Sequence, residues 1–227
     1  VIEAGFVLTA SYKYFPRGTI HLTVVDPGVG SSRKPLLLVT PLQMFIGPDN
    51  GIFSQMLKDN FPPTGTGVTP HPSFLPESVK AYHLNNPEFW MESVSRTFHA
   101  RDVFAPVAAY LALGLNPELM GQRIKNIETV QLPDVDRSES RIKGSVIFVD
   151  RFGNLITNIE PPFLGSQKIV ILIKGYALNG LSQSYSQGKP LLAVVGSHGF
   201  IEIAIKEGNA AQYLGAGVGE GVFVDFL

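Results

Sequence analysis

The sequence contains no cysteine among its 227 residues. This excludes disulfide bridges, thiolate nucleophiles and cysteine-ligated metal sites. The absence is compatible with a reducing compartment, and we expect a cytoplasmic protein. Neither the P-loop pattern nor the His-Glu-x-x-His zinc pattern occurs, and we predict no metal site.

The sequence also has almost no net charge and no long apolar run. Its 18 basic and 19 acidic residues leave a formal net charge of −1, so no global field attracts nucleic acid or an anionic membrane. No apolar run reaches the ~18 residues that a membrane-spanning helix needs. We therefore expect a small-molecule partner, with no nucleic acid and no membrane.

Residues 1–131 carry the pattern of an α/β domain. Hydrophobic residues make up 44% of the whole sequence, which is enough for a substantial core. Strands are expected at 19–25, 36–40 and 81–84, and helices at 1–8, 52–58 and 103–113. This alternation predicts a mostly parallel central sheet. A Pro-, Gly- and Thr-rich stretch, 61–76, is expected to be a surface loop.

The rest of the chain predicts a smaller all-β domain, barrel- or sandwich-like. Residues 132–142 are polar and are interpreted as a linker, and residues 143–227 form the second domain. Short β-like runs, separated by glycines and polar turns, occur at 144–149, 155–159, 169–173, 191–195, 201–205 and 222–226. Residues 209–214 allow one or two helical turns at most.

Asp26 follows the expected strand 19–25, at the strand end where open α/β sheets bind ligands. The turn after it is rich in glycine and serine and is expected to bring Arg33 back toward Asp26. A carboxylate held by a guanidinium keeps its charge and its position. Two interpretations stay open: a structural ion pair that closes the turn, or a functional pair.

A second polar cluster, Thr97 to Asp102, stands just before the helix expected at 103–113. Its histidine, His99, is able to donate or accept a proton near neutral pH. A lone histidine is nevertheless more often structural than catalytic, because catalysis needs partners. Asp102 is placed to cap the following helix.

Two polar turns stand out in the β domain. The segment Asp150 to Asn154 lies between two expected strands, and the segment Ser197 to Phe200 precedes another. Gly-Asn is ordinary in a hairpin turn, so each segment by itself also fits a plain connection.

Together these segments resemble the S-adenosyl-L-methionine (SAM) hydrolases, also called SAM hydroxide adenosyltransferases, which are related to enzymes that fluorinate and chlorinate SAM. The resemblance runs through nearly the whole chain. It rests on YFPRGTIH (14–21), VVDPGVG (24–30), GPDNG (47–51), TFHARDVFAP (97–106), DRFGNLITNI (150–159), SHGFIEIA (197–204) and GNAA (208–211). Seven motifs in order are far more specific than any one alone.

The resemblance implies hydrolysis of SAM to adenosine and L-methionine by in-line attack of water on ribose C5′. The family's water-handling triad falls on Asp26, Arg33 and His99. The sulfonium is already an excellent leaving group, so we expect no cofactor and no general acid, only a positioned water in a dry pocket. Whether Asp26 or His99 is the base stays open, because strongly interacting groups titrate as a unit.

The resemblance also assigns residues that bind the substrate. Asp150 would pair with the methionine ammonium, and Ser197, with His198, would bind the methionine carboxylate. The remaining members of the set are Thr97 and, for the adenosine end, Phe152, Asn154, Tyr185, Asn209 and the backbone of Ala210. Core packing is an equal alternative for the rings of Phe152 and Tyr185.

In the family the site lies between the α/β domain of one subunit and the β domain of a neighbour, in a trimer. We therefore expect a homotrimer whose monomer is inactive. The family's opening Thr-Asp-Phe-Gly motif, whose aspartate holds the ribose hydroxyls, has no counterpart in this sequence. Because the sequence begins at Val1 inside an expected helix, we expect a preceding segment that carries this motif.

Three alternatives stay open. Fluorinating relatives carry tyrosine and serine where this chain has His99 and Ala100; the lost hydroxyl argues against a fluoride site, whereas a small residue does not exclude chloride. A non-catalytic module that binds adenosine or SAM would keep Asp150, Asn154 and Asn209 and would not need the triad. A structural trimeric scaffold explains none of the polar motifs.

Overall fold

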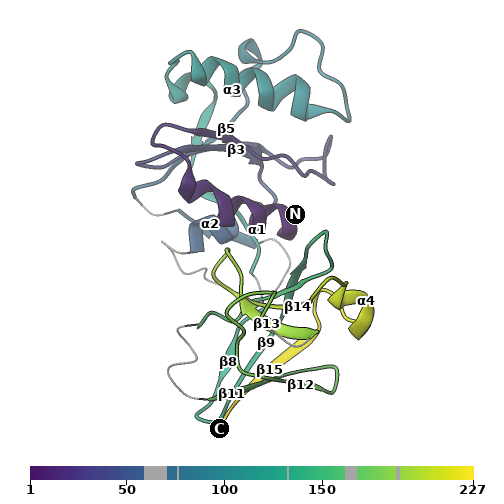
Figure 1. The fold of residues 1–227 in the computed structure, drawn as a ribbon. Coiled ribbons are helices and arrows are strands. Elements are labelled where there is room, and N and C mark those ends of the chain that lie inside the picture. Colours follow the sequence, from purple (N-terminus) through teal and green to yellow (C-terminus); the bar gives the residue numbers. More distant parts are fainter. Residues whose placement is uncertain (59–70, 76, 132, 162–167, 188–189) are drawn as a thin grey trace. The chain divides into compact units, whose positions relative to one another are not determined.

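The computed structural model describes residues 1–58, 71–75, 77–131, 133–161, 168–187 and 190–227. These residues divide into two compact units, Val1–Gln131 and Leu132–Leu227, and each is described by itself (Figure 1). Within these ranges, no helix is long and apolar enough to cross a membrane.

The first unit is a sheet with helices on both faces. Its strands are β1 (Ile20–Leu22), β2 (Pro35–Val39), β3 (Met44–Pro48), β4 (His71–Phe74), β5 (Lys80–His83), β6 (Gln122–Ile124) and β7 (Asn126–Thr129). Its helices are α1 (Ile2–Ser11), α2 (Ser54–Lys58) and α3 (Ala105–Ala112), with short turns η1 (Tyr12–Tyr14), η2 (Pro87–Phe89), η3 (Ala100–Phe104) and η4 (Pro117–Leu119). The main sheet has the order β1-β3-β2-β5-β6, and β4 pairs separately with β7.

The main sheet is mixed, so the prediction of a mostly parallel sheet was wrong. β1 and β3 are parallel, whereas the pairs β2–β3, β2–β5 and β5–β6 are antiparallel. The cause is local, because a tight turn joins β2 to β3. In this turn Thr40 N donates to Gln43 O and Gln43 N donates to Thr40 Oγ1, both at 3.0 Å. A connection this short joins only antiparallel strands.

Alternate side chains of β2 enter two apolar layers. Leu36 and Leu38 pack in one cluster with residues of α1 and α2. Leu37 packs in another cluster with residues of α3. Figure 1 shows the same order within this unit, with α3 on one side of the sheet and α1 and α2 on the other. Burial on both faces explains why this strand is a continuous apolar run.

One strand lies inside the stretch 61–76 that was expected to be a loop. β4 (His71–Phe74) forms an antiparallel pair with β7 (Asn126–Thr129), and this corrects the prediction for 71–74. A strand partner distant in the sequence gives no local signal, so the Pro-rich composition dominated the prediction. Residues 61–70 and 76 lie outside the described residues.

The second unit is an antiparallel sheet that nearly closes into a barrel. Its strands are β8 (Asp136–Arg137), β9 (Arg141–Val149), β10 (Leu155–Thr157), β11 (Ile169–Ile173), β12 (Tyr176–Asn179), β13 (Leu191–Val195), β14 (Ile201–Ile205) and β15 (Gly221–Phe226). They run in the order β12-β11-β15-β9-β10-β14-β13, and the two end strands contact each other. One helix, α4 (Ala210–Leu214), follows β14 among the described residues.

All six expected β runs of the second unit are strands in the structure. Inward side chains of this sheet, among them Ile142, Leu155, Ile171 and Ile203, form a single core cluster. The segment 132–142 departs from its interpretation as a linker. Part of it forms β8, which pairs with β9, and β9 itself begins at Arg141.

Candidate active site

Asp26 and Arg33 form a buried bidentate ion pair in the first unit. Arg33 Nε donates to Asp26 Oδ1 at 3.0 Å, and Nη2 donates to Oδ2. The Asp26 and Arg33 side chains are 5% and 8% exposed. The third nitrogen, Nη1, is buried and has no hydrogen-bond partner in the described part of the chain. A buried donor of this kind is available to a bound molecule.

The loop between Asp26 and Arg33 reverses the direction of the chain and is held by its own hydrogen bonds. Ser31 Oγ donates to Gly28 O at 2.6 Å and accepts from Arg33 N at 3.2 Å. Gly30 has a φ of +80°, and a Cβ at this position would lie 2.7 Å from Arg96 O. Glycine therefore permits both the left-handed turn and the close approach of this loop to the segment that carries His99.

The Gly-Pro-Asp-Asn-Gly turn holds both ends of this loop. Asn50 Nδ2 donates to Val25 O at 3.0 Å, immediately before Asp26. Asp49 N donates to Lys34 O at 2.9 Å, immediately after Arg33. In the sequence, the clustered turn residues mark this segment as a family motif but do not indicate that it positions the site.

Asp49 is itself a buried acid, 6% exposed, whose Oδ1 accepts from Glu128 N at 2.8 Å. Burial raises the pKa of its carboxyl to about 6, although the hydrogen bond from Glu128 N opposes this change. The ordinary value is 3.8, so the folded protein holds this proton more tightly than the unfolded chain does.

We expect Asp49→Asn to flatten the pH dependence of stability. The contribution of the protonated acid is fully present below about pH 4 and is lost as the pH rises through about 6. The variant should therefore be more stable than the wild type near pH 7.5, by up to about 3 kcal/mol, and should lose this advantage near pH 4. Urea denaturation across this range measures the difference. A constant difference at all pH values would contradict the assignment.

His99 lies at the start of η3, a π-helical turn of the kind often found at functional sites. The loop that carries the ion pair contacts this segment on both sides of the half-buried histidine. Gly30 packs on Arg96 O, and the Arg33 guanidinium carbon lies 5.5 Å from the centre of the Phe104 ring. The structure thus brings together the two segments that carry the three predicted triad residues. Within the described residues, His99 is not hydrogen-bonded to Asp26 or Arg33.

Asp102 stabilises the turn that leads into η3. Its carboxylate accepts from Ser95 N at 2.8 Å and from Arg101 Nε at 2.6 Å, and it is 1% exposed. The Arg101 guanidinium, and then the Ser95 backbone, hold the pKa of Asp102 well below its usual range. Asp102 therefore closes the turn before the helix, which corrects the expectation that it caps the helix. This turn carries the exposed Thr97.

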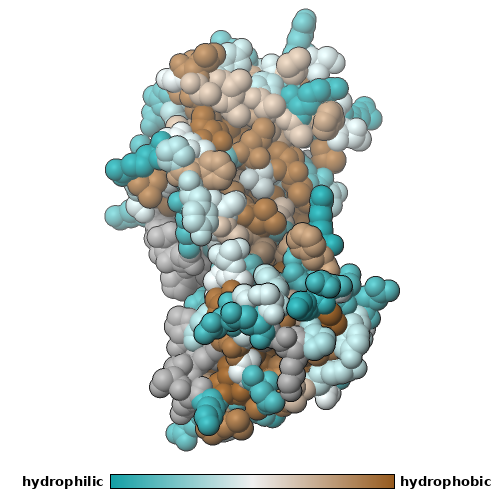
Figure 2. Space-filling view, viewed as in Figure 1, coloured by the Kyte–Doolittle hydropathy of each residue, from teal (hydrophilic) through white to brown (hydrophobic). Residues whose placement is uncertain are grey.

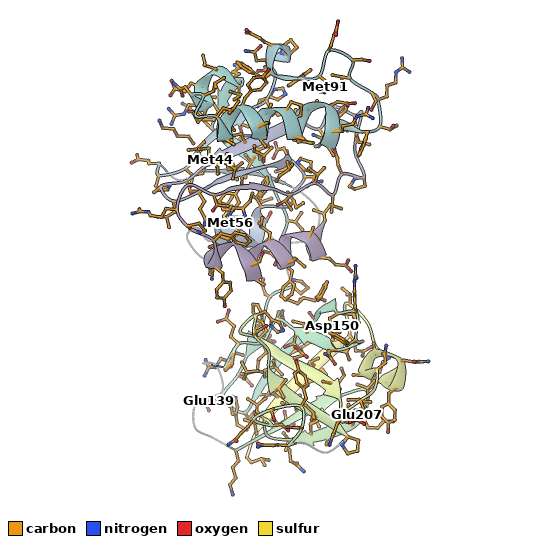
Figure 3. The ribbon with its side chains drawn as sticks, turned by 45° about the horizontal axis from the view of Figure 1, so that its top comes forward. Met44, Met56, Met91, Glu139, Asp150 and Glu207 are labelled. Carbon is orange, nitrogen blue, oxygen red and sulfur yellow. The ribbon has the colours of Figure 1, made fainter. Side chains whose placement is uncertain are left out.

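In the second unit, Asp150 organises the turn between β9 and β10 (Figure 3). Its Oδ1 accepts from Phe152 N at 2.9 Å and from Asn154 N at 2.8 Å, and its Oδ2 accepts from Asn154 Nδ2 at 2.9 Å. The carboxylate is thereby fixed and the amide of Asn154 is buried. Phe152 projects from the same turn and is 77% exposed, which excludes core packing for its ring.

Asn209 joins this turn from the other side. Its side chain packs directly on Gly153, which has a φ of +84°, and its Oδ1 caps α4 by accepting from Gln212 N at 2.7 Å. Ala211 N also donates to Gly153 O at 2.9 Å. The structure thus brings Asp150, Phe152, Asn154 and Asn209 together. Ala210 is fully buried in the core, so neither its side chain nor its backbone is exposed to solvent.

Tyr185 and His198 meet at a residue that sequence reasoning missed. Glu202 Oε1 accepts from Tyr185 Oη at 2.6 Å, and Oε2 lies 3.2 Å from His198 Nε2. His198 Nδ1 accepts from Phe200 N at 3.2 Å, so both ring nitrogens are engaged. Ser197, on the same turn, is exposed. In the sequence, Glu202 is a single acidic residue within an apolar strand, and this pattern could have indicated its special role.

The turn that carries Asp150 lies near the cluster formed by Tyr185, His198 and Glu202. Burial, together with the Glu202 carboxylate and then Asp150, raises the pKa of the Tyr185 phenol. The residue Tyr185 is 47% exposed, so it is only partly packed into the protein. Among the described residues, no group of three or more His, Asp or Glu side chains is arranged to hold a metal ion.

Comparison with known proteins identifies both units. The N-terminal domain of the SAM hydroxide adenosyltransferases matches residues 1–121, and the C-terminal domain of that family matches residues 144–223. The chain is 33% identical to the (R)-S-adenosyl-L-methionine hydrolase of Thermus thermophilus over 94% of this chain and 78% of that protein. It is 32% identical to the hydrolase of the same name from Salinispora arenicola, over 97% and 79%.

More distant relatives include the fluorinase of Nocardia brasiliensis, 24% identical over 65% of this chain and 53% of that protein. Among solved structures, a conserved protein from Thermotoga maritima matches with a TM-score of 0.82 and 29% identity, covering 99% of this chain and 83% of that one. The chain belongs to the SAM hydroxide adenosyltransferase family.

Proposed function

We propose that this protein is an enzyme that hydrolyses SAM to adenosine and L-methionine. The (R)-S-adenosyl-L-methionine hydrolases cover nearly all of this chain at about 30% identity. The single structural observation that carries the proposal is the buried Asp26–Arg33 pair with an unsatisfied Arg33 Nη1, held against the segment of His99.

In the proposed reaction, a water oxygen attacks ribose C5′ in line with the departing methionine sulfur. The C5′–O bond forms as the C5′–S bond breaks, and the sulfonium leaves as the neutral thioether of L-methionine. Arg33 fixes the carboxylate of Asp26 and offers Nη1–H to the water oxygen. Asp26 and His99 orient the water and share the proton that it loses.

The substrate itself supplies the leaving group, so we propose that the reaction needs no cofactor. A sulfonium departs without protonation, and no residue has to act as a general acid. The protein contributes position, a fixed negative charge beside the water and exclusion of bulk solvent.

In the second unit, the exposed Phe152 ring is placed to stack on adenine. Asn154 and Asn209 meet at the Gly153 turn and supply amide groups for the adenosine end. We assign Asp150 to the methionine ammonium and Ser197 to the methionine carboxylate. Thr97 completes the set from the first unit.

Water rather than halide is the proposed nucleophile. His99 supplies a titratable imidazole, and Ala100 supplies no hydroxyl donor for a halide ion. These are the positions where the sequence departs from the fluorinating relatives. Among the relatives compared, the hydrolases are also more similar to this chain than the fluorinase is.

We further propose that the protein is a homotrimer with sites at the subunit interfaces. Figure 2 shows apolar side chains on the surface of the first unit. The exposed large apolar and aromatic residues of this unit include Tyr14, Phe15, Leu22 and Val25. Apolar surface of this kind favours association. Sedimentation velocity should report three copies, and an interface variant that sediments as a monomer should be inactive. An active monomer would contradict this assignment.

The function is tested by incubating the protein with SAM, with and without chloride, and separating the products by chromatography. Adenosine and L-methionine in equal amounts are expected in both samples. A chlorinated nucleoside that depends on chloride would identify a halogenase. Adenosine binding without any product would identify a binding module.

A further inference from the structure

Glu202 is a buried acid to which the proposed reaction assigns no role. It is the second residue of β14 (Ile201–Ile205), where Ile201 and Ile203 point into the core of the second unit. Side chains alternate along a strand, so Glu202 points to the opposite face. Its neighbours on that face are apolar and buried, among them Val194 and Ala204.

Burying a carboxylate among apolar side chains costs several kcal/mol unless hydrogen bonds compensate. Glu202 is 4% exposed, and each of its oxygens has a partner: Tyr185 Oη at 2.6 Å and His198 Nε2 at 3.2 Å. Burial alone would raise the pKa of Glu202, but the bonds from His198 and Tyr185 bring it below its usual value. The acid is therefore held as an anion between two donors.

The two donors come from segments far apart in the sequence. Tyr185 lies in the connection between β12 and β13, and His198 lies in the turn between β13 and β14. His198 Nδ1 accepts from Phe200 N, so the proton on the ring is at Nε2 and points to Glu202. The histidine thereby fixes the turn whose exposed residue is Ser197.

We propose that Glu202 is a positioning residue that fixes both the Tyr185 ring and the Ser197–His198 turn around the substrate. This inference rests on the proposed function, in which Tyr185 serves the adenine end of SAM and the turn serves the methionine carboxylate. The hydrogen bond to Glu202 fixes the position of the Tyr185 phenol, and a partly exposed ring in a fixed position is ready to stack on a base.

Two substitutions distinguish the two links of Glu202, its hydrogen bond with Tyr185 and its hydrogen bond with His198. Glu202→Gln keeps an oxygen that accepts from Tyr185 Oη, but its amide NH2 cannot accept from His198 Nε2–H. Glu202→Leu removes both links and places an aliphatic side chain among apolar neighbours. Loss of one hydrogen bond corresponds to an affinity change of about tenfold.

The experiment measures the KM and kcat of each variant for SAM, the Kd for adenosine by calorimetry, and the melting temperature. For Glu202→Gln we expect the KM to rise about tenfold, with kcat and the adenosine Kd within about twofold of wild type. For Glu202→Leu, which loses both links, we expect the KM to rise about 100-fold and the adenosine Kd to rise about tenfold. Adding Tyr185→Phe to the leucine variant should change nothing more, because the hydroxyl has already lost its partner.

Asp225→Asn is the matched control, because it neutralises another carboxylate in the same unit that is paired bidentately, to Arg141. It should leave the KM and the adenosine Kd unchanged. Glutamate variants that lower only the melting temperature would show a purely structural role and overturn the inference. If the wild type binds adenosine but does not hydrolyse SAM, the proposed function fails while the adenosine measurements still test Glu202. No adenosine binding by the wild type would overturn both.

Discussion

Replacing Asp26 by asparagine should lower kcat for SAM hydrolysis by about 10²- to 10⁴-fold, the usual contribution of a group that handles the proton of a nucleophile. The amide keeps an acceptor for Arg33 Nε but carries no negative charge to orient or deprotonate the water. The KM should change little, because Asp26 is assigned to the water and not to the substrate. Single-turnover formation of adenosine, followed by chromatography, measures the effect.

The companion variant is His99→Gln, made alone and together with Asp26→Asn. If the two residues act on one water, their effects are strongly non-additive and the double variant is little slower than the slower single variant. Adenosine binding by all three proteins shows that they are folded. An Asp26→Asn protein that retains more than about a third of wild-type kcat would be inconsistent with a role at the reacting water.

Replacing Arg33 by methionine should lower the free energy of unfolding by about 3–5 kcal/mol, because it leaves a buried carboxylate without its partner. The Asp26 side chain is 5% exposed, so solvent cannot replace the guanidinium. The aliphatic part of the side chain is kept, which limits the change in packing beside Phe104. Urea denaturation at neutral pH gives the difference.

An exposed ion pair of similar geometry provides the control. Arg141 is paired bidentately with Asp225, and their side chains are 49% and 28% exposed. Arg141→Met should therefore cost much less stability than Arg33→Met, because solvent screens the exposed pair. Combining Arg33→Met with Asp26→Asn should restore part of the lost stability, since the uncompensated charge is removed. Equal losses for the two arginine variants would show that burial does not govern the Asp26–Arg33 pair.

The strands of the second unit were predictable because their burial pattern is local. In β14, Ile201 and Ile203 face the core, and the polar turns before and after mark the ends of the strand. The direction of the strands in the first unit was not predictable in the same way. It depends on the tight turn between Thr40 and Gln43, and an apolar run such as β2 has the same pattern whether its neighbours are parallel or antiparallel.

Contacts within the candidate site were predictable where one short loop contains both partners. Asp26 and Arg33 are separated by one glycine-rich turn, and the pair forms as expected. The positioning residues were not predictable, because their partners are distant in the sequence. Asn50 reaches Val25, and Glu202 reaches Tyr185, through contacts that exist only in the folded protein.

The central claim, that water attacks ribose C5′, is tested most directly by running the reaction in water enriched in ¹⁸O and examining adenosine by mass spectrometry. If water attacks C5′, each turnover places one ¹⁸O atom in the 5′-hydroxyl group of adenosine and none in L-methionine. Adenosine without label, or label in methionine, would contradict this claim, because the oxygen would not have entered at C5′.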